Sequence, residues 1–468
     1  MINTSYLRDK FSEQRTVRFL VIAGVILTSA VLAYRFQIRN LRFILVMLVG
    51  LGGVIVFLRW PPLGLVMLVF SSMLVPFALG TGTNTQINVT VLLLTLLLGL
   101  WLFDMVVRQR QIRITNSRAI YSLIVFILVS ILSFGMGQFE WYPLARNASL
   151  PSQLGGLAVF ILSAGAFLLG AHQIPDMRWL KRLIWLFMII GSFVVIGRLL
   201  SYLGNSINIF PRGAATSLFW VWFAALAFSQ ALCNSQLPTH WRAVLMGLVF
   251  GSIYVNLFLG TSWVSGWLPA LVAVITIIWV GIPQLRLHFT LLGGLGIVVF
   301  ASTIWDFLLS DNQYSYMTRL EAWRIVGEIV KVNPIFGLGP SNYRFYTPLF
   351  SIFGYNVPFN SHNNYVDIIA QIGFLGLACF IWFSWEVGRL GWKLYPKVQD
   401  GFAKAFVLGC LGGLGGTLVA GMLGDWVLPF VYNVGLQGFR SSVLGWLFLG
   451  GLVALERGYS RSVLKVDG

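Results

Sequence analysis

The sequence has few charged residues and very few of the residues that build metal sites or cross-links. Asp, Glu, Lys and Arg together make up 10% of its 468 residues, whereas 57% of the residues are hydrophobic. Soluble globular proteins carry about 25% charged residues, so this composition excludes that class. The mean hydropathy of +0.82 predicts a protein that crosses a membrane many times.

The chain contains three cysteines and four histidines. Cys233, Cys379 and Cys410 all fall inside apolar runs, so neither a disulfide framework nor a zinc site is indicated. The acids predicted to face outward, which a metal-dependent sugar transferase would pair around its metal, are scattered along the chain. They are Glu140, Asp311, Glu321, Glu328 and Asp425. We therefore predict no metal and no cofactor.

Lysine and arginine outnumber the acids by 32 to 15, which gives a formal net charge of +17. A strongly basic chain can indicate nucleic acid binding, but here the basic residues lie in short loops between apolar runs. That arrangement is typical of proteins oriented in a membrane. We predict no nucleic acid partner.

The fold class predicted from these apolar runs is an all-α polytopic membrane protein. Runs of about 17 to 25 apolar residues are long enough to span a bilayer. They predict about 14 membrane helices, within a range of 12 to 14, and the first of them lacks the cleavage site of a signal peptide. The predicted spans are 19–34, 43–58, 63–79, 89–107, 119–135, 154–172, 183–203, 214–233, 243–259, 267–282, 290–308, 364–388, 405–423 and 441–456.

In this arrangement most of the lysines and arginines fall on the side of the membrane that holds both termini. The positive-inside rule makes that side cytoplasmic, although Arg35, Arg39 and Arg42 form a short loop that goes against the rule. We predict a multi-pass protein of the bacterial cytoplasmic (inner) membrane. It would have three parts, which are helices in 1–308, one long outward loop at 309–363 that carries the active site, and helices in 364–468.

The long outward loop is predicted to contain an amphipathic helix. Thr318, with Glu321 three residues later, is typical of a capping box that opens a helix, and Asn333-Pro334 would end it. Its apolar residues at helical spacing would face the membrane surface or the bundle. They are Leu320, Trp323, Gly327 and Val330.

Arg319 would occupy the first position of that helix, where the helix dipole disfavours a cation. A bound phosphate would offset the cost, since helix N-termini and guanidinium groups both bind phosphate. A plain exposed arginine is the alternative. Arg324 has a simpler interpretation, because Glu321 and Glu328 lie within about one helical turn of it and would pair with it.

The segment Asn360-Ser361-His362-Asn363-Asn364 ends the loop and leads into an apolar run. Ser361 occupies a predicted N-cap, so His362 would stand at the top of a membrane helix with Gly373 and Gly376 below it on the same face. The groove over these glycines would admit a neighbouring helix or a lipid tail. The helix dipole would keep His362 neutral near pH 7, as a general base must be.

These residues resemble the O-antigen ligase and O-antigen polymerase superfamily of membrane glycosyltransferases. The family pattern of His, then Asn, Ser or Gln, with two glycines further along, is met by His362, Asn363, Gly373 and Gly376. The preceding loop resembles the family's order of Arg, Trp, Pro and Gly-x-Gly in Arg319, Trp323, Pro334, Gly337 and Gly339.

The family also places an arginine in an earlier outward loop, for which Arg212 is the best match here and Arg198 the second. Where many members carry an arginine in the next outward loop, this chain has Trp263. One cation of the usual set is therefore missing.

The resemblance implies a C-type glycosyltransferase-like fold and a metal-independent, inverting transfer of a glycan from a polyprenyl (undecaprenyl) pyrophosphate. It implies that His362 is the general base and that Arg319 and Arg212 stabilise the departing diphosphate. The expected substrate contacts are Arg324, Asn363, Arg198, Trp323 and Tyr343, with the four glycines as a structural motif. The expected partners are the lipid-linked glycan, a glycan or lipid acceptor, membrane lipids and a chain-length regulator.

The motif leaves the acceptor open. A polymerase uses a second lipid-linked glycan, and a ligase uses a finished lipid or protein; the many spans and the missing arginine favour a polymerase of cell-surface polysaccharide. The rival class is a transporter of a small anion or of the lipid-linked glycan, which should carry ionisable residues near the membrane midplane. Apart from Arg198 the predicted midplane is empty, which favours chemistry at the outward surface.

Overall fold

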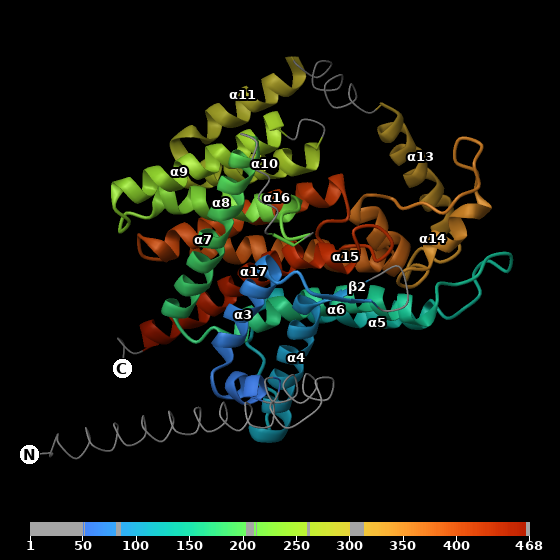
Figure 1. Ribbon diagram of the computed structural model, residues 1–468, viewed down its shortest axis with the longest axis horizontal. Coiled ribbons are helices and arrows are strands. Elements are labelled where there is room, and N and C mark those ends of the chain that lie inside the picture. The colour runs from blue at the N-terminus through green and yellow to red at the C-terminus, as the bar shows by residue number, and fades with distance from the viewer. Residues whose placement is uncertain are drawn as a thin grey trace, which may run out of the picture. The chain divides into compact units, whose positions relative to one another are not determined.

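The computed structural model describes residues 50, 52–80, 86–202, 210–211, 213–259, 263–299 and 313–464 (Figure 1). The chain divides into two compact units, 1–63 and 64–468. The second unit holds the site and nearly all of the described helices, and the following paragraphs concern it. The predicted span 19–34, half of 43–58 and the end of 290–308 lie outside the described residues.

Within the described ranges, nine helices are long and apolar enough to cross a membrane, which confirms a polytopic helical membrane protein; the predicted number of 14 is not confirmed. Their bounds are α4 Val89–Phe103 continued by η1 Asp104–Arg108, α5 Arg118–Met136, α6 Leu150–Gln173, α7 Met177–Tyr202, α9 Thr239–Tyr254 continued by η2 Val255–Leu259, α10 Val264–Gly281, α15 Asn364–Leu394, α16 Phe402–Leu423 and α17 Gly435–Leu464.

The remaining elements are shorter or more polar. They are α3 Pro61–Leu74, α8 Ser217–Cys233, η3 Pro283–Leu285, α11 Arg286–Val299, α13 Gln313–Val330, α14 Tyr343–Tyr346 and η4 Thr347–Leu349. Two short antiparallel strands, β1 Ala78–Gly80 and β2 Gln86–Asn88, pair Ala78 with Asn88, so the structure adds one hairpin to the predicted all-α fold.

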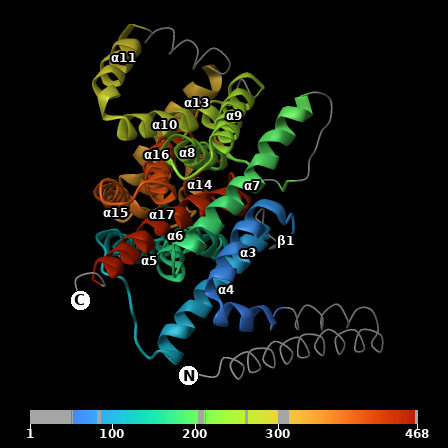
Figure 2. The same cartoon turned by 90° about the vertical axis from the view of Figure 1, so that its left-hand side faces the viewer.

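Close helix packing holds the bundle together. Figure 2 shows α8, α10 and α16 next to one another, with Trp222 of α8 fully buried there. The pair α6 and α17 meets through glycines on both helices, since a Cβ on Gly170 would overlap the Leu447 carbonyl oxygen and one on Gly450 would overlap that of Phe167. Small residues let membrane helices approach to backbone contact, and this fixes the starts of α6 and α17 beside the site.

The last predicted span, 441–456, is part of α17, which already begins at Gly435. Arg440 therefore lies inside the helix and is buried, rather than preceding it. Its guanidinium group donates to the carbonyl oxygens of Ser71, Val75 and Phe77, which follow or end α3. Carbonyl groups at a helix end lack partners within the helix, so Arg440 serves as a cap for α3.

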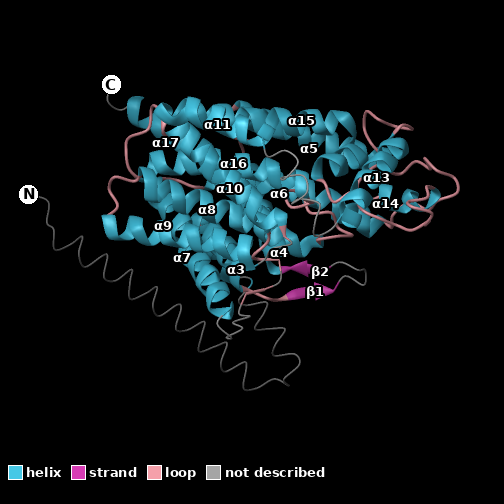
Figure 3. Ribbon diagram, turned by 90° about the horizontal axis from the view of Figure 1, so that it is seen from above, coloured by secondary structure: helices cyan, strands magenta, loops and turns pink. Residues whose placement is uncertain are grey.

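Loops and the short helices α13 and α14 gather at one end of this unit, which we call the α13 end (Figure 3). One face of α13 packs on an apolar cluster beneath it that includes Leu338, Tyr343, Tyr346 and Phe430. The buried residues of α13 are Ala322, Ile325, Val326, Ile329 and Val330. Of the predicted apolar residues, Val330 is buried in this contact, whereas Leu320 and Gly327 are exposed.

The predicted capping box was also wrong. The helix α13 begins at Gln313, five residues before Thr318. The Thr318 hydroxyl donates to the Tyr314 carbonyl oxygen at 2.6 Å, as a threonine inside a helix does. Arg319 therefore lies well inside α13, and the argument from the dipole at its first position does not apply.

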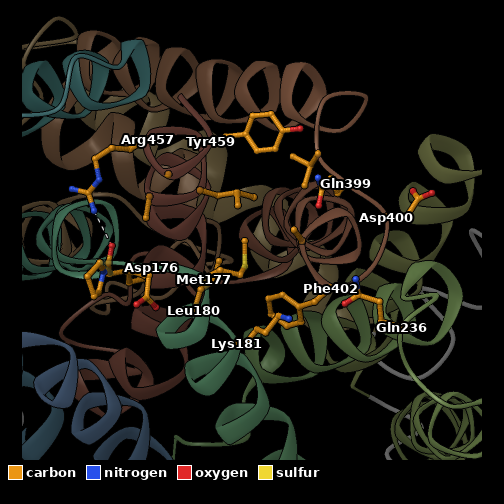
Figure 4. Close-up of a pocket in the computed structure, with 17 residues that line it drawn as sticks. Asp176, Met177, Leu180, Lys181, Gln236, Gln399, Asp400, Phe402, Arg457 and Tyr459 are labelled. Atoms are coloured by element: carbon orange, nitrogen blue, oxygen red, sulfur yellow. Dashed lines mark hydrogen bonds between the residues drawn. The ribbon is translucent and has the colours of Figure 1, made fainter. Parts of the chain in front are cut away.

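A cavity of about 570 Å3 is bordered by the first turns of α7 and α16, the later part of α17 and the connections before α7 and α16 (Figure 4). Lys181, Asp176, Asp400 and Arg457 contribute to its wall. Arg457 donates to the carbonyl oxygens of His172 and Ile174, and Lys404 pairs with Asp400. None of the site residues predicted from the sequence lines this cavity.

Candidate active site

His362 lies at the α13 end in an unusual backbone conformation. Its φ is +51°, in the left-handed region, and α15 begins only at Asn364. The N-cap is Asn363, whose side-chain oxygen accepts from the backbone N–H groups of Tyr365 and Val366. The prediction that Ser361 caps the helix and that His362 is helical was wrong. A non-glycine residue at positive φ costs energy and is held only where its neighbours fix it.

Three side chains from other segments fix the residues next to His362. Trp323 of α13 donates from Nε1 to the Ser361 carbonyl oxygen at 2.7 Å. The Ser361 hydroxyl donates to the buried Asp367 carboxylate at 2.7 Å, which is why it is not the helix cap. Tyr343 donates to the same carboxylate at 2.6 Å and accepts from the Ser361 N–H at 3.2 Å.

These contacts change the roles expected for three residues. Tyr343 is fully buried and stacks on Phe430, so the structure leaves it no open face for a substrate. Burial and the nearby Asp367 raise the pKa of Tyr343 well above its ordinary value. Asn363 is buried by its capping bonds, and the indole N–H of Trp323 is occupied. All three hold the His362 segment in place.

The loop after α13 docks into a break in α15. Gly373 has φ +73° and ψ −179° inside this helix, so the regular backbone pattern stops there. The N–H groups of Phe374 and Leu375 donate instead to the carbonyl oxygens of Pro334 and Ile335, at 2.8 and 3.2 Å. A Cβ on Gly373 would overlap the Ile335 carbonyl oxygen. The groove predicted beneath His362 is thus filled by backbone, and neither a helix nor a lipid tail enters it.

The Gly-x-Gly turn completes the same contact. Leu338 and Gly339 donate from their N–H groups to the carbonyl oxygens of Ala370 and Gln371, at 2.9 and 3.0 Å. Gly337 and Gly339 have φ values of +69° and +86°, which only glycine adopts readily. A Cβ on Gly376, in contrast, would meet the Ile372 side chain of its own helix. Gly337, Gly339 and Gly373 therefore have a structural role.

A buried carboxylate lies behind the imidazole. The Asn433 side-chain nitrogen is 3.0 Å from Nδ1 of His362 and 2.6 Å from Oδ1 of Asp425. Asp425 is 1% exposed, and its other oxygen accepts from the Phe430 N–H at 2.9 Å. Burial raises the pKa of Asp425 above its ordinary value. Burial also lowers the pKa of His362, and Arg319 and Arg344 lower it further.

His362 is therefore neutral near pH 7, as predicted, but the cause differs from the one expected. The dipole of α15 does not act on a helical His362, because His362 precedes the helix. Removal from water and two nearby cations both disfavour a charged imidazole. A neutral imidazole can accept or donate a proton at the pH of the cell.

Arg319 and Arg344 reach His362 from two different elements. Arg319 of α13 is largely buried and donates to the carbonyl oxygen of Leu423, at the end of α16, at 3.5 Å. Burial lowers the pKa of Arg319, and the carboxylate of Asp425 partly offsets this. Arg344 of α14 donates to the Asn360 side chain at 2.6 Å and lies 5.5 Å from the ring centre of Tyr432. The two guanidinium groups together place positive charge near the imidazole.

The other cations predicted at the site have different positions. Arg324 is on the exposed face of α13 and makes a two-point pair with Glu321, so the simpler interpretation of this residue holds. Arg198 is exposed on α7 and lies in the span as predicted. Arg212 lies outside the described residues. The ring of Trp263 stands edge-on to that of Trp426, the residue after Asp425.

Sequence reasoning missed Arg344, Asn433 and the part played by Asp425. Asp425 was counted only as one of several scattered acids, and nothing in the sequence marks Asn433. Arg344 comes five residues after Gly339 and lies among aromatic residues, and an isolated cation at that place is the signal that could have indicated it. A cavity of about 480 Å3 adjoins these residues and is lined among others by Gln86, Arg344, Tyr432, Asn433 and Gln437.

Comparison with known proteins gave one match. Residues 238–381 match the family model described as O-antigen ligase. This segment of the chain is similar to the O-antigen ligase family. This confirms the resemblance predicted from His362, Arg319 and the glycines, all of which fall inside the match. No curated protein matches the chain.

The match covers residues 238–381 of the 468-residue chain, and it is one of the grounds for the function proposed below. The matched range begins before α9 and ends inside α15. Asp425 and Asn433, which complete the surroundings of His362, lie beyond it and come from the connection between α16 and α17.

Proposed function

We propose that this protein transfers a glycan from a polyprenyl pyrophosphate to an acceptor hydroxyl at the outer face of the bacterial cytoplasmic membrane. The observation that carries the proposal is a neutral, half-buried histidine beside two arginines, inside an O-antigen ligase domain. This combination supplies both groups that the reaction needs, which are a proton acceptor and fixed positive charge.

In the proposed reaction the acceptor hydroxyl gives its proton to His362 while its oxygen bonds to the anomeric carbon of the donor sugar. The bond from that carbon to the diphosphate oxygen breaks, and the electron pair leaves with the diphosphate. Attack from the face opposite the diphosphate inverts the configuration. The polyprenyl diphosphate is the second product, and it leaves with a charge that cations must stabilise.

Arg319, Arg344 and Arg212 are proposed to stabilise that charge. Guanidinium groups stay protonated and form paired hydrogen bonds to phosphate oxygens. For Arg212, which lies outside the described residues, the support is the family resemblance alone. The 480 Å3 cavity, whose wall includes Arg344 and the His362 partner Asn433, is the proposed place for the donor glycan and the acceptor.

For the acceptor we propose a second lipid-linked glycan, which makes the protein a cell-surface polysaccharide polymerase. Trp263 at a position where many relatives carry arginine favours this acceptor. The span count that also favoured it is not confirmed. The second candidate is a ligase that moves the finished glycan to a lipid or protein, and the description of the matched family favours it.

Removal of the protein from the producing cell tests the function. The glycan ladder on a gel and the lipid-linked pool are compared with those of cells that carry the protein. Collapse of the ladder to single repeat units identifies a polymerase. Full-length chains that stay on the polyprenyl carrier identify a ligase. An unchanged ladder, or loss of transport of the lipid-linked glycan or of a small anion without loss of transfer, contradicts the proposal.

Arg319→Gln is expected to lower the rate of glycan transfer by about 10- to 100-fold, since a charge-assisted hydrogen bond contributes about 1.5 to 3 kcal/mol. Arg324→Gln is the matched control, because Arg324 lies one turn further along the same helix, exposed and paired with Glu321. It should stay within about threefold of the unchanged protein. Initial rates with purified protein in liposomes decide the comparison, and equal losses for both variants would contradict the role of Arg319.

Transfer is expected to survive exhaustive chelation of divalent metals. The proposed cations are all arginines, so no step requires manganese or magnesium. The measurement compares initial rates in the presence of EDTA with rates after either metal is restored. A rate that falls with EDTA and recovers with metal would show that the arginines do not stabilise the diphosphate alone.

A further inference from the structure

A single atom of the Asn433 amide stands between His362 and Asp425. It is 3.0 Å from the imidazole Nδ1 and 2.6 Å from the carboxylate oxygen Oδ1. Both distances suit hydrogen bonds. The other carboxylate oxygen of Asp425 is occupied by the Phe430 N–H, so Oδ1 is the oxygen that faces the amide.

The chemistry of an amide allows this bridge in two forms. In the first, the amide nitrogen is in the middle and donates one hydrogen to each neighbour, so Asp425 is ionised and Nδ1 has its lone pair toward Asn433. The proton of the neutral imidazole is then on Nε2. In the second, the amide is turned over and its oxygen accepts from both neighbours. Asp425 then carries a proton, Nδ1 carries the imidazole proton, and Nε2 has an open lone pair.

We propose that Asn433 is a positioning residue that links the tautomer of His362 to the proton on Asp425, so that Nε2 can accept a proton only while Asp425 is protonated. The inference rests on the proposed function for its consequence in catalysis, but the linkage itself is a property of the resting protein. Asn433 and Asp425 need not touch the substrate. They decide whether the histidine is a base or a donor at Nε2.

In its buried surroundings Asp425 holds a proton more readily than a carboxylate exposed to water does. Asp425 is 1% exposed, and burial disfavours its charge. Asp367 of α15, with Tyr343 bonded to it, adds a second acid in the same region. The positive charge of Arg319 favours the ionised form of Asp425 instead. Arg319 and Arg344 both lower the pKa of His362.

The sign of the pH dependence follows. As pH falls, His362 takes a second proton and activity is lost, as for any general base. As pH rises, Asp425 loses its proton, Asn433 turns its nitrogen toward both neighbours, and Nε2 is left as a donor. Glycan transfer should therefore pass through a maximum and fall again on the alkaline side.

Asp425→Asn separates this linkage from a requirement for a negative charge. The new side chain can place its oxygen on the Phe430 N–H and its nitrogen toward Asn433, as protonated Asp425 does. We expect transfer within about threefold of the maximum of the unchanged protein, with the alkaline fall absent. A loss of 100-fold or more in a protein that is still folded would show that the ionised carboxylate is needed, and would overturn the linkage.

A spectroscopic experiment tests the linkage without any substrate. The chain has four histidines, so 15N-histidine labelling gives few signals in solid-state NMR of the protein in liposomes, and His362→Gln identifies those of His362. In the unchanged protein we expect His362 to change from the Nδ1–H to the Nε2–H tautomer as pH rises. In Asp425→Asn it should remain the Nδ1–H tautomer at every pH. In Asn433→Leu the change should also be absent. If the tautomer of His362 in the unchanged protein does not change with pH, the linkage is wrong. If the tautomer changes as expected but the protein shows no glycan transfer, the linkage stands and the proposed function is wrong.

Discussion

Replacing His362 with glutamine is expected to lower glycan transfer by about 100- to 10,000-fold, the usual contribution of a general base. Glutamine is the sharpest substitution because its amide can still bond to Asn433, whereas it cannot take a proton from an acceptor hydroxyl. The segment is held by Trp323, Tyr343 and Asp367 independently of the imidazole, so the fold should persist. The loss should appear in the rate of transfer with purified protein and lipid-linked donor.

The other histidines provide the control. His240 is exposed in the first turn of α9, and its ring lies against Trp241. His240→Gln should transfer at the rate of the unchanged protein. In the producing cell, His362→Gln should reproduce the glycan ladder of cells without the protein. A normal ladder from a stably produced His362→Gln protein would show that His362 is not catalytic. Transport would then become the favoured function.

Gly373→Ala is expected to disrupt the α13 end of the protein rather than to slow its chemistry selectively. The added methyl group would overlap the Ile335 carbonyl oxygen, and alanine disfavours the φ of +73° at this position. Backbone atoms on both sides cannot move aside as a flexible side chain would. We expect a loss of about 3 kcal/mol or more in the free energy of unfolding, from overpacking and backbone strain together.

A glycine in α13 serves as the matched control for this substitution. Gly327 is exposed, and a Cβ added there would meet nothing within 4 Å. Because alanine is the better helix former, Gly327→Ala should be neutral or stabilising by up to about 1 kcal/mol. Thermal unfolding in detergent and abundance in membranes compare the two variants. Equal stability would mean that the loop does not need to dock at Gly373.

Several features of the site could be predicted because they depend on local sequence and residue type. The apolar runs predict membrane helices from length and hydropathy alone. The motif of His362, Asn363, Gly373 and Gly376 indicated the family, and the family match confirms it. The pairing of Arg324 with Glu321 followed from helical spacing, which is a local rule.

Predictions about where the helices begin near the site failed at two residues that fit the N-cap preference. Ser361 and Thr318 both fit the N-cap preference, but their hydroxyls bond elsewhere, to Asp367 and to the Tyr314 carbonyl oxygen. At Ser361 the capping preference of about 1 kcal/mol is outweighed by a buried carboxylate that needs donors. Thr318, in contrast, lies inside a helix that already begins at Gln313. Because Ser361 bonds to Asp367 and Asn363 caps α15, His362 precedes the helix. Its neutrality therefore comes from burial and nearby cations rather than from the helix dipole.

By itself, the sequence determined that the protein is a helical membrane protein with many spans and which residue types its proposed chemistry uses, since these depend on composition and short-range spacing. Only the tertiary structure decided which residues surround the histidine. Asp425 and Asn433 approach His362 because α15, α16 and α17 end or begin at the same place, and Gly373 opens its helix because a distant loop supplies the missing carbonyl groups. Contacts between segments so far apart in the chain depend on packing, for which a single sequence carries no local signal.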